Sequence, residues 1–315
     1  MKFWTEGDQV EEYRVSYFRE DPELNDLFAR WHMHWPSWFN PTKYGQPEWN
    51  HRGEIFYYFH QQILARYVLE RYANCLPTVE TLEWTKPIRA GYNPNLIDMK
   101  GNYMFTRPDH VNIKDFFPYG VSTTGKIERW LIDSTDSKAY VAFVSGATGN
   151  ILTTMRDPVF YQFLQRMNKF VHRYKTSLPP YSIKELGCHG VKINSIEVGK
   201  LTTFFEPFEY DASYGLGIGP REDKEKLHYV ASGVRLNREP FTMKFKITSD
   251  ETAEVMVRVF IGPKYDSEGQ KMTLEQSRLA YFEIDRFPVE REFPKGNRRK
   301  SSQNAKIYQK LSIEY

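Results

Sequence analysis

The hydrophobic period changes once along this chain, near the pair Pro179-Pro180, and this change constrains the fold more than any other feature. Before the pair, the long apolar segments repeat with the period of about 3.6 residues that is typical of helices; after it, apolar and polar residues alternate as in half-buried strands. Two successive prolines end a helix, because proline lacks a backbone N–H and clashes with the preceding turn. The sequence therefore predicts a helical part and then a β part, with a domain boundary near Pro180.

Three helices are predicted in the first part. The longest covers Gly53–Asn74 and contains no further Gly or Pro. A second covers Asp157–Lys175, with Pro158 in its first turn, where proline is well tolerated. A shorter helix is expected over Leu24–His34. Six apolar residues at helical spacing are expected to form the buried stripe of the second helix: Phe160, Phe163, Leu164, Met167, Phe170 and Val171.

The second part shows the alternation of antiparallel strands. Two alternating runs, Phe241–Thr248 and Val255–Ile261, flank the turn-forming residues Ser249–Thr252 and predict a hairpin. Further strands are expected at Val191–Val198, Leu201–Phe205 and Leu279–Asp285. Such strands most often form a two-layer sandwich. We therefore predict an α+β chain with a helical domain in residues 1–180 and an antiparallel β-sandwich in residues 181–315.

Charge and aromatic content narrow the function classes. The net charge is only +3, and the basic run Arg298-Arg299-Lys300 has no interleaved aromatics, so a nucleic-acid binder is not indicated. Phe and Tyr together supply 43 of 315 residues, and all aromatics reach 16%. Such rings can fill cores and subunit interfaces, or the aromatic content can itself be the product of a protein made to be digested. Composition leaves both interpretations open.

The sequence contains no uninterrupted apolar run of 18 or more residues, so no membrane span is predicted. The first residues, Met-Lys-Phe-Trp-Thr-Glu-Gly-Asp, lack the apolar centre of a signal peptide. Taken literally, this indicates a cytosolic chain. Cys75 and Cys188 are too few for a disulfide framework, and we expect two free thiols packed as small hydrophobes.

Histidines are the remaining candidates for chemistry. His32 and His34 point to different sides of a helix and cannot share one metal ion, whereas a histidine four residues before His32 could; Phe28 occupies that position. His60 lies within the longest predicted helix and could face His32 across a helix pair. Two such histidines are more often packed or hydrogen-bonded rings than metal ligands. The sequence also contains no Gly-x-Ser-x-Gly nucleophile motif.

Six segments of the chain are distinctive: YFRED from Tyr17, WHMHWP from Trp31, RGEIFYYFHQQILARYVLERYAN from Arg52, MRDPVFYQF from Met155, GVKINSIEV from Gly190 and FIGPKYD from Phe260. In this order they resemble the arthropod hemocyanin and hexamerin superfamily, and the resemblance runs from Tyr17 to about Pro294. Within that superfamily, the aromatic content and the segment WHMHWPSWFN most resemble hexamerins, especially the cockroach arylphorin-type storage proteins known as allergens.

The resemblance implies a helical middle domain and an immunoglobulin-like β-sandwich, in a secreted haemolymph hexamer. The family's oxygen carriers and phenoloxidases hold two coppers, each with three histidines. Mapped onto this sequence, the first copper keeps His32 and His60 but has Phe28 as its third position, and the last position of the second falls at Leu164. These positions are therefore expected to be vestiges, with no copper and no other cofactor.

Length differences accompany the resemblance. The connection from Ile127 to Thr154 is too short for the family's helices, which indicates an internal deletion or a splice product, and the family's N-terminal helical domain is expected to be missing. The sequence therefore predicts a non-enzymatic storage protein. Two alternatives stay open: a copper-dependent oxygen carrier or phenoloxidase, and a carrier of hormones or other small apolar ligands.

Overall fold

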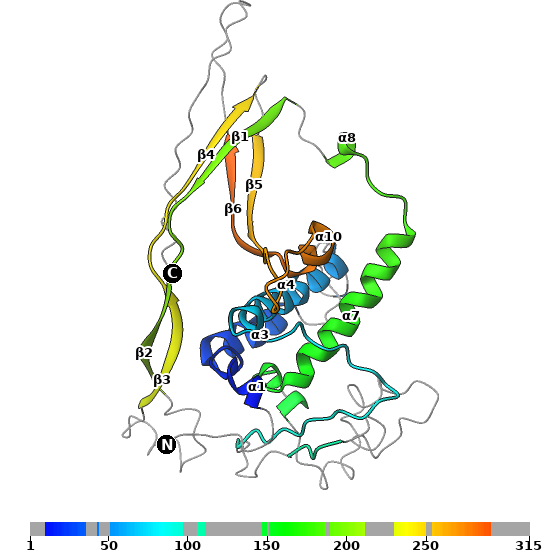
Figure 1. Ribbon diagram of the computed structural model, residues 1–315, viewed down its shortest axis with the longest axis vertical. Helices are drawn as coiled ribbons and strands as arrows, with labels where there is room; N and C mark the ends of the chain where they lie inside the picture. Colours follow the sequence, from blue (N-terminus) through cyan, green and yellow to red (C-terminus); the bar gives the residue numbers. More distant parts are fainter. Residues whose placement is uncertain are drawn as a thin grey trace, which may run out of the picture.

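The computed structural model describes residues 10–35, 43, 51–96, 106–110, 147–149, 151–186, 190–211, 230–249 and 254–290. A group of helices is formed by the first part of the chain, and antiparallel strand pairs from the second part lie beside it (Figure 1). The helices are α1 (Val10–Tyr13), α2 (Ser16–Arg19), α3 (Pro22–His34), α4 (Arg52–Ala73), α7 (Pro158–Ser177), α8 (Ile183–Leu186) and α10 (Leu274–Ser277). The described residues also include the 3-10 turns η3 (Ala147–Gly149), η4 (Thr154–Arg156) and η5 (Arg278–Ala280).

Helix α4 is the centre of the helical group and confirms the predicted helix over Gly53–Asn74. Polar residues such as Gln61, Gln62 and Glu70 are buried along with its apolar ones, because other elements cover it on several sides. The glutamate is paired with Arg66 one turn earlier, so its charge is compensated. The helix thus needs polar partners from other parts of the chain as well as apolar packing.

Helix α7 begins where the sequence predicts. Asp157 is its N-cap and accepts a hydrogen bond from the backbone N–H of Val159 at 2.9 Å. The predicted buried stripe is only partly right: Phe160 and Leu164 are buried, but Phe163 and Phe170 are exposed, the latter at 75%. At about 100° per residue, these two lie seven positions apart on the side turned away from α4. Tyr161 is buried instead, and its ring stacks on Tyr67 of α4 at 3.7 Å.

One apolar core joins the helices. It includes Phe28 of α3, Tyr67 of α4 and Leu164 of α7, together with Met155 of η4. Ala280 of η5 belongs to the same core, although it comes from the C-terminal half of the chain. The helical core therefore also holds the segment that leads into the last strand.

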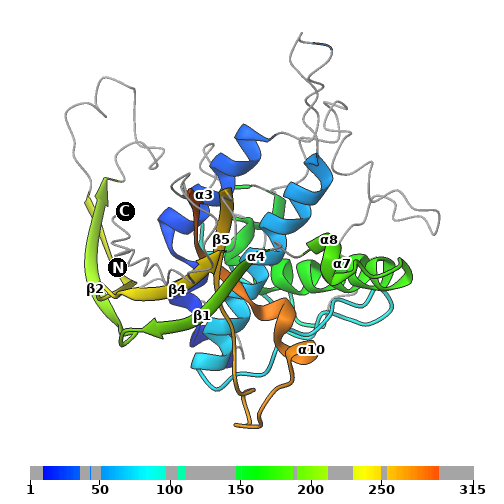
Figure 2. The ribbon, with the colours of Figure 1, turned by 90° about the horizontal axis from the view of Figure 1, so that it is seen from above.

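Where the structure describes the second part, it forms three antiparallel strand pairs: β1 (Val191–Val198) with β4 (Met243–Ser249), β2 (Thr203–Asp211) with β3 (Val230–Arg238), and β5 (Glu254–Ile261) with β6 (Phe282–Glu290). Viewed from above, β1, β2 and β4 form a curved layer to one side of α3 and α4 (Figure 2). This arrangement confirms the α+β class with an antiparallel β part.

The predicted hairpin between residues 241–248 and 255–261 is wrong. The two runs are strands β4 and β5, but their backbones pair with β1 and β6. Their apolar faces pack on each other instead, with Phe245 and Ile247 of β4 in one core with Val257 and Val259 of β5. Alternation identifies the buried face of a strand and not its hydrogen-bonded neighbour, so both arrangements give the same sequence pattern.

Two smaller differences between the predictions and the structure concern the start of the last strand and the environment of Cys75. The last strand begins at Phe282 rather than Leu279, because residues 278–280 form η5. Cys75 is exposed and free rather than packed as a small hydrophobe, since it follows the end of α4 in the left-handed region (φ 57°). Cys188 and most of the connection from 127 to 154 lie outside the described residues. No helix among the described residues is long and apolar enough to cross a membrane.

Candidate functional site: a histidine pair among aromatic rings

Two helices bring the candidate histidines together. Helix α3 is fixed at its start by Asp21, whose side chain accepts from the N–H of Leu24 at 2.8 Å, and it carries His32 in its last turn. Helix α4 carries His60 in its third turn. The two Nε2 atoms lie 3.2 Å apart, so residues that are 28 positions apart in the sequence form a direct contact. The expectation that His60 faces His32 across a helix pair is confirmed.

Hydrogen bonds indicate which tautomers these histidines adopt. Nδ1 of His60 lies 2.8 Å from the backbone carbonyl oxygen of Phe56, and a carbonyl oxygen can only accept, so Nδ1 carries the proton and donates. In the neutral ring, Nε2 is then the acceptor, and Nε2–H of His32 donates to it. One hydrogen bond therefore joins two neutral imidazoles.

Burial keeps both rings neutral. The pKa of His60 is lowered to about 4, mainly because burial removes the water that would solvate the charged ring; the bond to the Phe56 carbonyl opposes this shift, and neighbouring His32 adds to it. Burial also lowers the pKa of His32. Charged imidazolium would lose its hydration here, and no ion pair with a carboxylate compensates for this within the part of the chain that the structure describes, so neutral rings are favoured near pH 7.

Aromatic rings surround the pair. The ring of Phe28, 3% exposed, lies 4.5 Å from His32 and 5.7 Å from His60, edge to face with both. Behind it, Phe160 of α7 lies at 5.3 Å. Trp31 stacks on Phe59 at 4.2 Å beside the pair. Edge-to-face and stacked rings attract each other beyond the burial of their area, so these contacts hold α3, α4 and α7 together.

The donor set does not fit a pair of copper ions. Each copper ion of such a pair is held by several imidazole nitrogens. At this site, two imidazoles are present and Phe28 contributes only carbon where a third ligand would lie. Leu164, the other mapped position, is an aliphatic residue of the apolar core, 1% exposed. Within the described part of the chain, no group of three or more His, Cys, Asp or Glu side chains could hold a metal ion.

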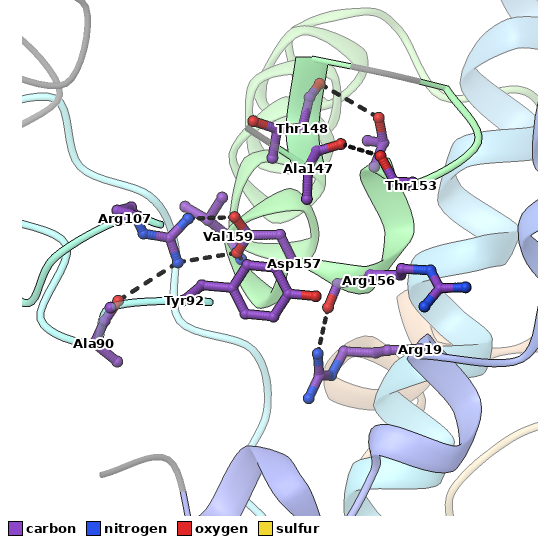
Figure 3. A network of polar contacts seen from close by, with 12 residues as sticks. Arg19, Ala90, Tyr92, Arg107, Ala147, Thr148, Thr153, Arg156, Asp157 and Val159 are labelled. Carbon is purple, nitrogen blue, oxygen red and sulfur yellow. Dashed lines mark hydrogen bonds and ion pairs between the residues drawn. The ribbon is translucent and has the colours of Figure 1, made fainter. Parts of the chain in front are cut away.

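A buried ion pair positions the helix behind the histidines, and sequence reasoning missed it. Arg107 forms a two-pronged salt bridge with Asp157, in which Nη2 donates to Oδ1 at 2.9 Å (Figure 3). Asp157 is also the N-cap of α7, so one carboxylate fixes both the start of the helix and the arginine. Proline after an aspartate signals the cap, but no local pattern reveals an arginine that is 50 residues away.

A second arginine completes this network. Nη1 of Arg19 donates to the backbone oxygen of Arg156, and the Arg156 guanidinium donates to Glu20 at 2.6 Å (Figure 3 shows the first of these contacts). These contacts tie α2 to η4, directly before Pro158 and Phe160. The network therefore sets the position of α7 against the aromatic cluster.

The chain matches two family models of hemocyanins. The copper-containing domain matches over residues 2–142, and the ig-like domain over residues 180–315. Helix α7, with Leu164, lies between the two matched ranges. Together the two ranges include most of the chain.

Relatives align along most of the chain as well. The chain is 32% identical to Allergen Cr-PI of Periplaneta americana, 30% to Arylphorin subunit alpha of Manduca sexta and 28% to Sex-specific storage-protein 1 of Bombyx mori. These alignments cover 89%, 88% and 87% of this chain, but 49%, 48% and 44% of the relatives. The chain thus spans about half the length of the relatives it matches.

A solved structure agrees with this assignment. A scorpion hemocyanin in its activated state is similar with a TM-score of 0.71 and 25% identity, over 91% of this chain and 55% of that chain. The order of a helical group and an ig-like β part is common to the family models and to the fold described above. The chain therefore belongs to the hemocyanin and hexamerin superfamily.

Proposed function

We propose that this chain serves as an aromatic-rich amino-acid reservoir of the hexamerin type. The observation that carries the proposal is the composition: aromatic residues make up 16% of the chain, and Phe and Tyr supply most of them. Many of these rings are not needed in the described core. Phe170, Tyr174 and Tyr181 are exposed, so they add aromatic content without adding buried area.

We further propose that the chain is not an enzyme and that His32 and His60 are vestiges of a copper site. Phe28 beside the two rings and Leu164 in the apolar core support this, because neither side chain can ligate a metal. The bond to Phe56 and the bond between the imidazoles occupy both ring nitrogens of His60 and Nε2 of His32, which lowers the tendency of these atoms to recruit an ion. Oxygen carriage and phenol oxidation would both need the metal.

Localisation and assembly are part of the same proposal. Hexamerins act in the haemolymph as hexamers, and relatives of this chain include an arylphorin and a storage protein. We propose an extracellular reservoir that associates with other subunits of its kind.

Tracing the protein through a moult tests the reservoir. Chain labelled with ¹³C-tyrosine is injected into the haemolymph of a larva, with equally labelled serum albumin as a control of ordinary composition. The intact chain should disappear during the moult, and its labelled tyrosine should enter new tissue protein and cuticle more efficiently than that of the control. Persistence of the intact chain through the moult would contradict the proposal.

A further inference from the structure

The segment that follows α7, here called the connector, is exposed over its described length up to Ser182. Helix α7 ends at Ser177, and residues 173–182 are all exposed. Tyr181 is 74% exposed, although it is a large aromatic residue. In Figure 1 the chain leaves α7 and reaches α8 along the outer edge of the molecule. A protease can therefore approach Tyr181 from solvent, and it has to open only the four-residue helix α8 (Ile183–Leu186) that follows.

The backbone of the connector has the conformation that proteases bind. Leu178 is extended (φ −85°, ψ 152°), and Pro179 and Pro180 fix the next two φ angles near −65°. Among the described residues, no backbone hydrogen bond involves residues 179–181. An exposed, extended segment can enter a protease cleft, as extended peptides bind to sheet edges. The N–H of the Tyr181–Ser182 bond belongs to Ser182 and donates to the exposed carboxylate of Glu185 at 2.7 Å, so a protease has to displace this one contact.

The neighbouring aromatic residues do not share this accessibility. Tyr174 is 62% exposed, but it lies within α7, where its peptide bonds belong to the helix. Cleavage there requires the last turns of the helix to open first, and that opening costs free energy. A protease that selects aromatic residues should therefore cut after Tyr181 and spare Tyr174.

The helical part and the β part are also joined by contacts that do not involve the connector. Nε2 of Gln61 donates to the backbone oxygen of Leu279 at 2.8 Å, and Nε2 of Gln62 donates to that of Tyr281 at 3.1 Å. The Gln62 side-chain oxygen accepts from the N–H of Glu283 at 2.6 Å. Two glutamines of α4 thus hold the segment that begins β6, and both are buried.

A charged contact adds to this joint. The Glu283 carboxylate accepts from the hydroxyl of Tyr58 on α4 and from Arg258 on β5. Farther away, Arg235 of β3 pairs with Glu23 of α3 at 3.1 Å, and the ring of Phe205 meets Tyr17 at 4.9 Å. Since none of these contacts passes through residues 178–182, cutting the connector leaves them in place.

We propose that the Tyr181–Ser182 peptide bond is a processing site for a serine protease of chymotrypsin-like specificity, and that the cut chain stays together as two associated fragments. Hydrolysis adds one water across the bond, leaving a carboxylate on Tyr181 and an α-amino group on Ser182. The product would be a chain opened for further digestion but still folded. Its use in mobilising a reserve rests on the proposed function, whereas the cleavage itself does not.

Limited proteolysis of the full chain with chymotrypsin tests the site. Mass spectrometry should detect an early fragment that begins at Ser182. Tyr181→Ala should slow the appearance of this fragment by about tenfold or more, because the variant lacks the side chain that fills the specificity pocket of the protease, and such a loss lowers kcat/KM at least that much. The matched variant Tyr174→Ala should leave its rate unchanged. An equal effect of both variants, or no Ser182 fragment, would overturn the assignment.

Size-exclusion chromatography of the cut chain tests the association. Fragments 1–181 and 182–315 should elute together in native buffer and separate in concentrated urea. Separation in native buffer would overturn this half of the proposal. The outcome is distinguishable from the moult experiment, because a chain cut at this bond in the test tube could still persist in the animal, and a consumed chain could be cut elsewhere.

Discussion

Replacing Phe28 with alanine should destabilise the helical group strongly, because this ring fills the space between the two histidines and α7. It is 3% exposed and contacts the rings of His32, His60, Phe59 and Phe160. Truncating a buried phenylalanine costs about 3–5 kcal/mol, and more where the surroundings cannot collapse. The contacting rings come from three helices that are fixed elsewhere, so we expect a loss of about 4 kcal/mol.

Urea unfolding followed by circular dichroism at the helical band measures this loss. With a slope of about 3 kcal/mol per M, the midpoint should fall by about 1 M. Leu27→Ala is the matched control: it is the preceding residue of the same helix, is 56% exposed, and should change stability by no more than about 0.5 kcal/mol. If both variants lose the same stability, Phe28 does not fill a packed site and the argument fails.

Two further predictions concern buried polar groups. The pKa of His60 is about 4 in the folded chain and 6.5 in the unfolded chain, so the unfolded state binds more protons between these pH values. The free energy of unfolding should therefore fall by about 3 kcal/mol as the pH drops through this window. Urea titrations at both ends should show a smaller drop in His60→Gln, and an unchanged drop would refute this. Arg107→Met leaves the Asp157 carboxylate buried without its cation and should cost about 3–5 kcal/mol. Arg30→Met, which removes an exposed pair with Asp26, should cost less than about 1 kcal/mol, and similar losses would show that burial does not govern the pair.

The sequence predicts those features that local rules determine. Periodicity locates α4, α7 and β1 to within a few residues, because burial of one face imposes a fixed spacing. An aspartate before Pro158 marks the start of α7. Strand pairing is not predictable in the same way: β4 and β5 have matching apolar faces whether they pair or stack, and the stacked arrangement is the one that occurs.

The candidate site likewise combines local features that the sequence predicts with a long-range contact that it does not. His32 and Phe28 can be placed on one helix face from spacing alone, and the facing position of His60 follows from a second helix. Its contact with the Phe56 carbonyl is also local, one turn away. In contrast, the pairing of Arg107 with Asp157 joins residues far apart in the chain, and no periodic pattern encodes it. Which of the apolar residues of α7 are buried likewise depends on where α4 lies.

The amount of copper that the purified chain retains tests the central claim most directly. The chain is loaded anaerobically with excess Cu(I), dialysed, analysed by mass spectrometry of the metal and then exposed to oxygen. Two imidazoles beside Phe28 should retain well under one copper per chain, with no peroxide-type absorbance after oxygenation. Two coppers per chain together with that absorbance would show an intact oxygen site and would contradict the account of a reservoir without copper.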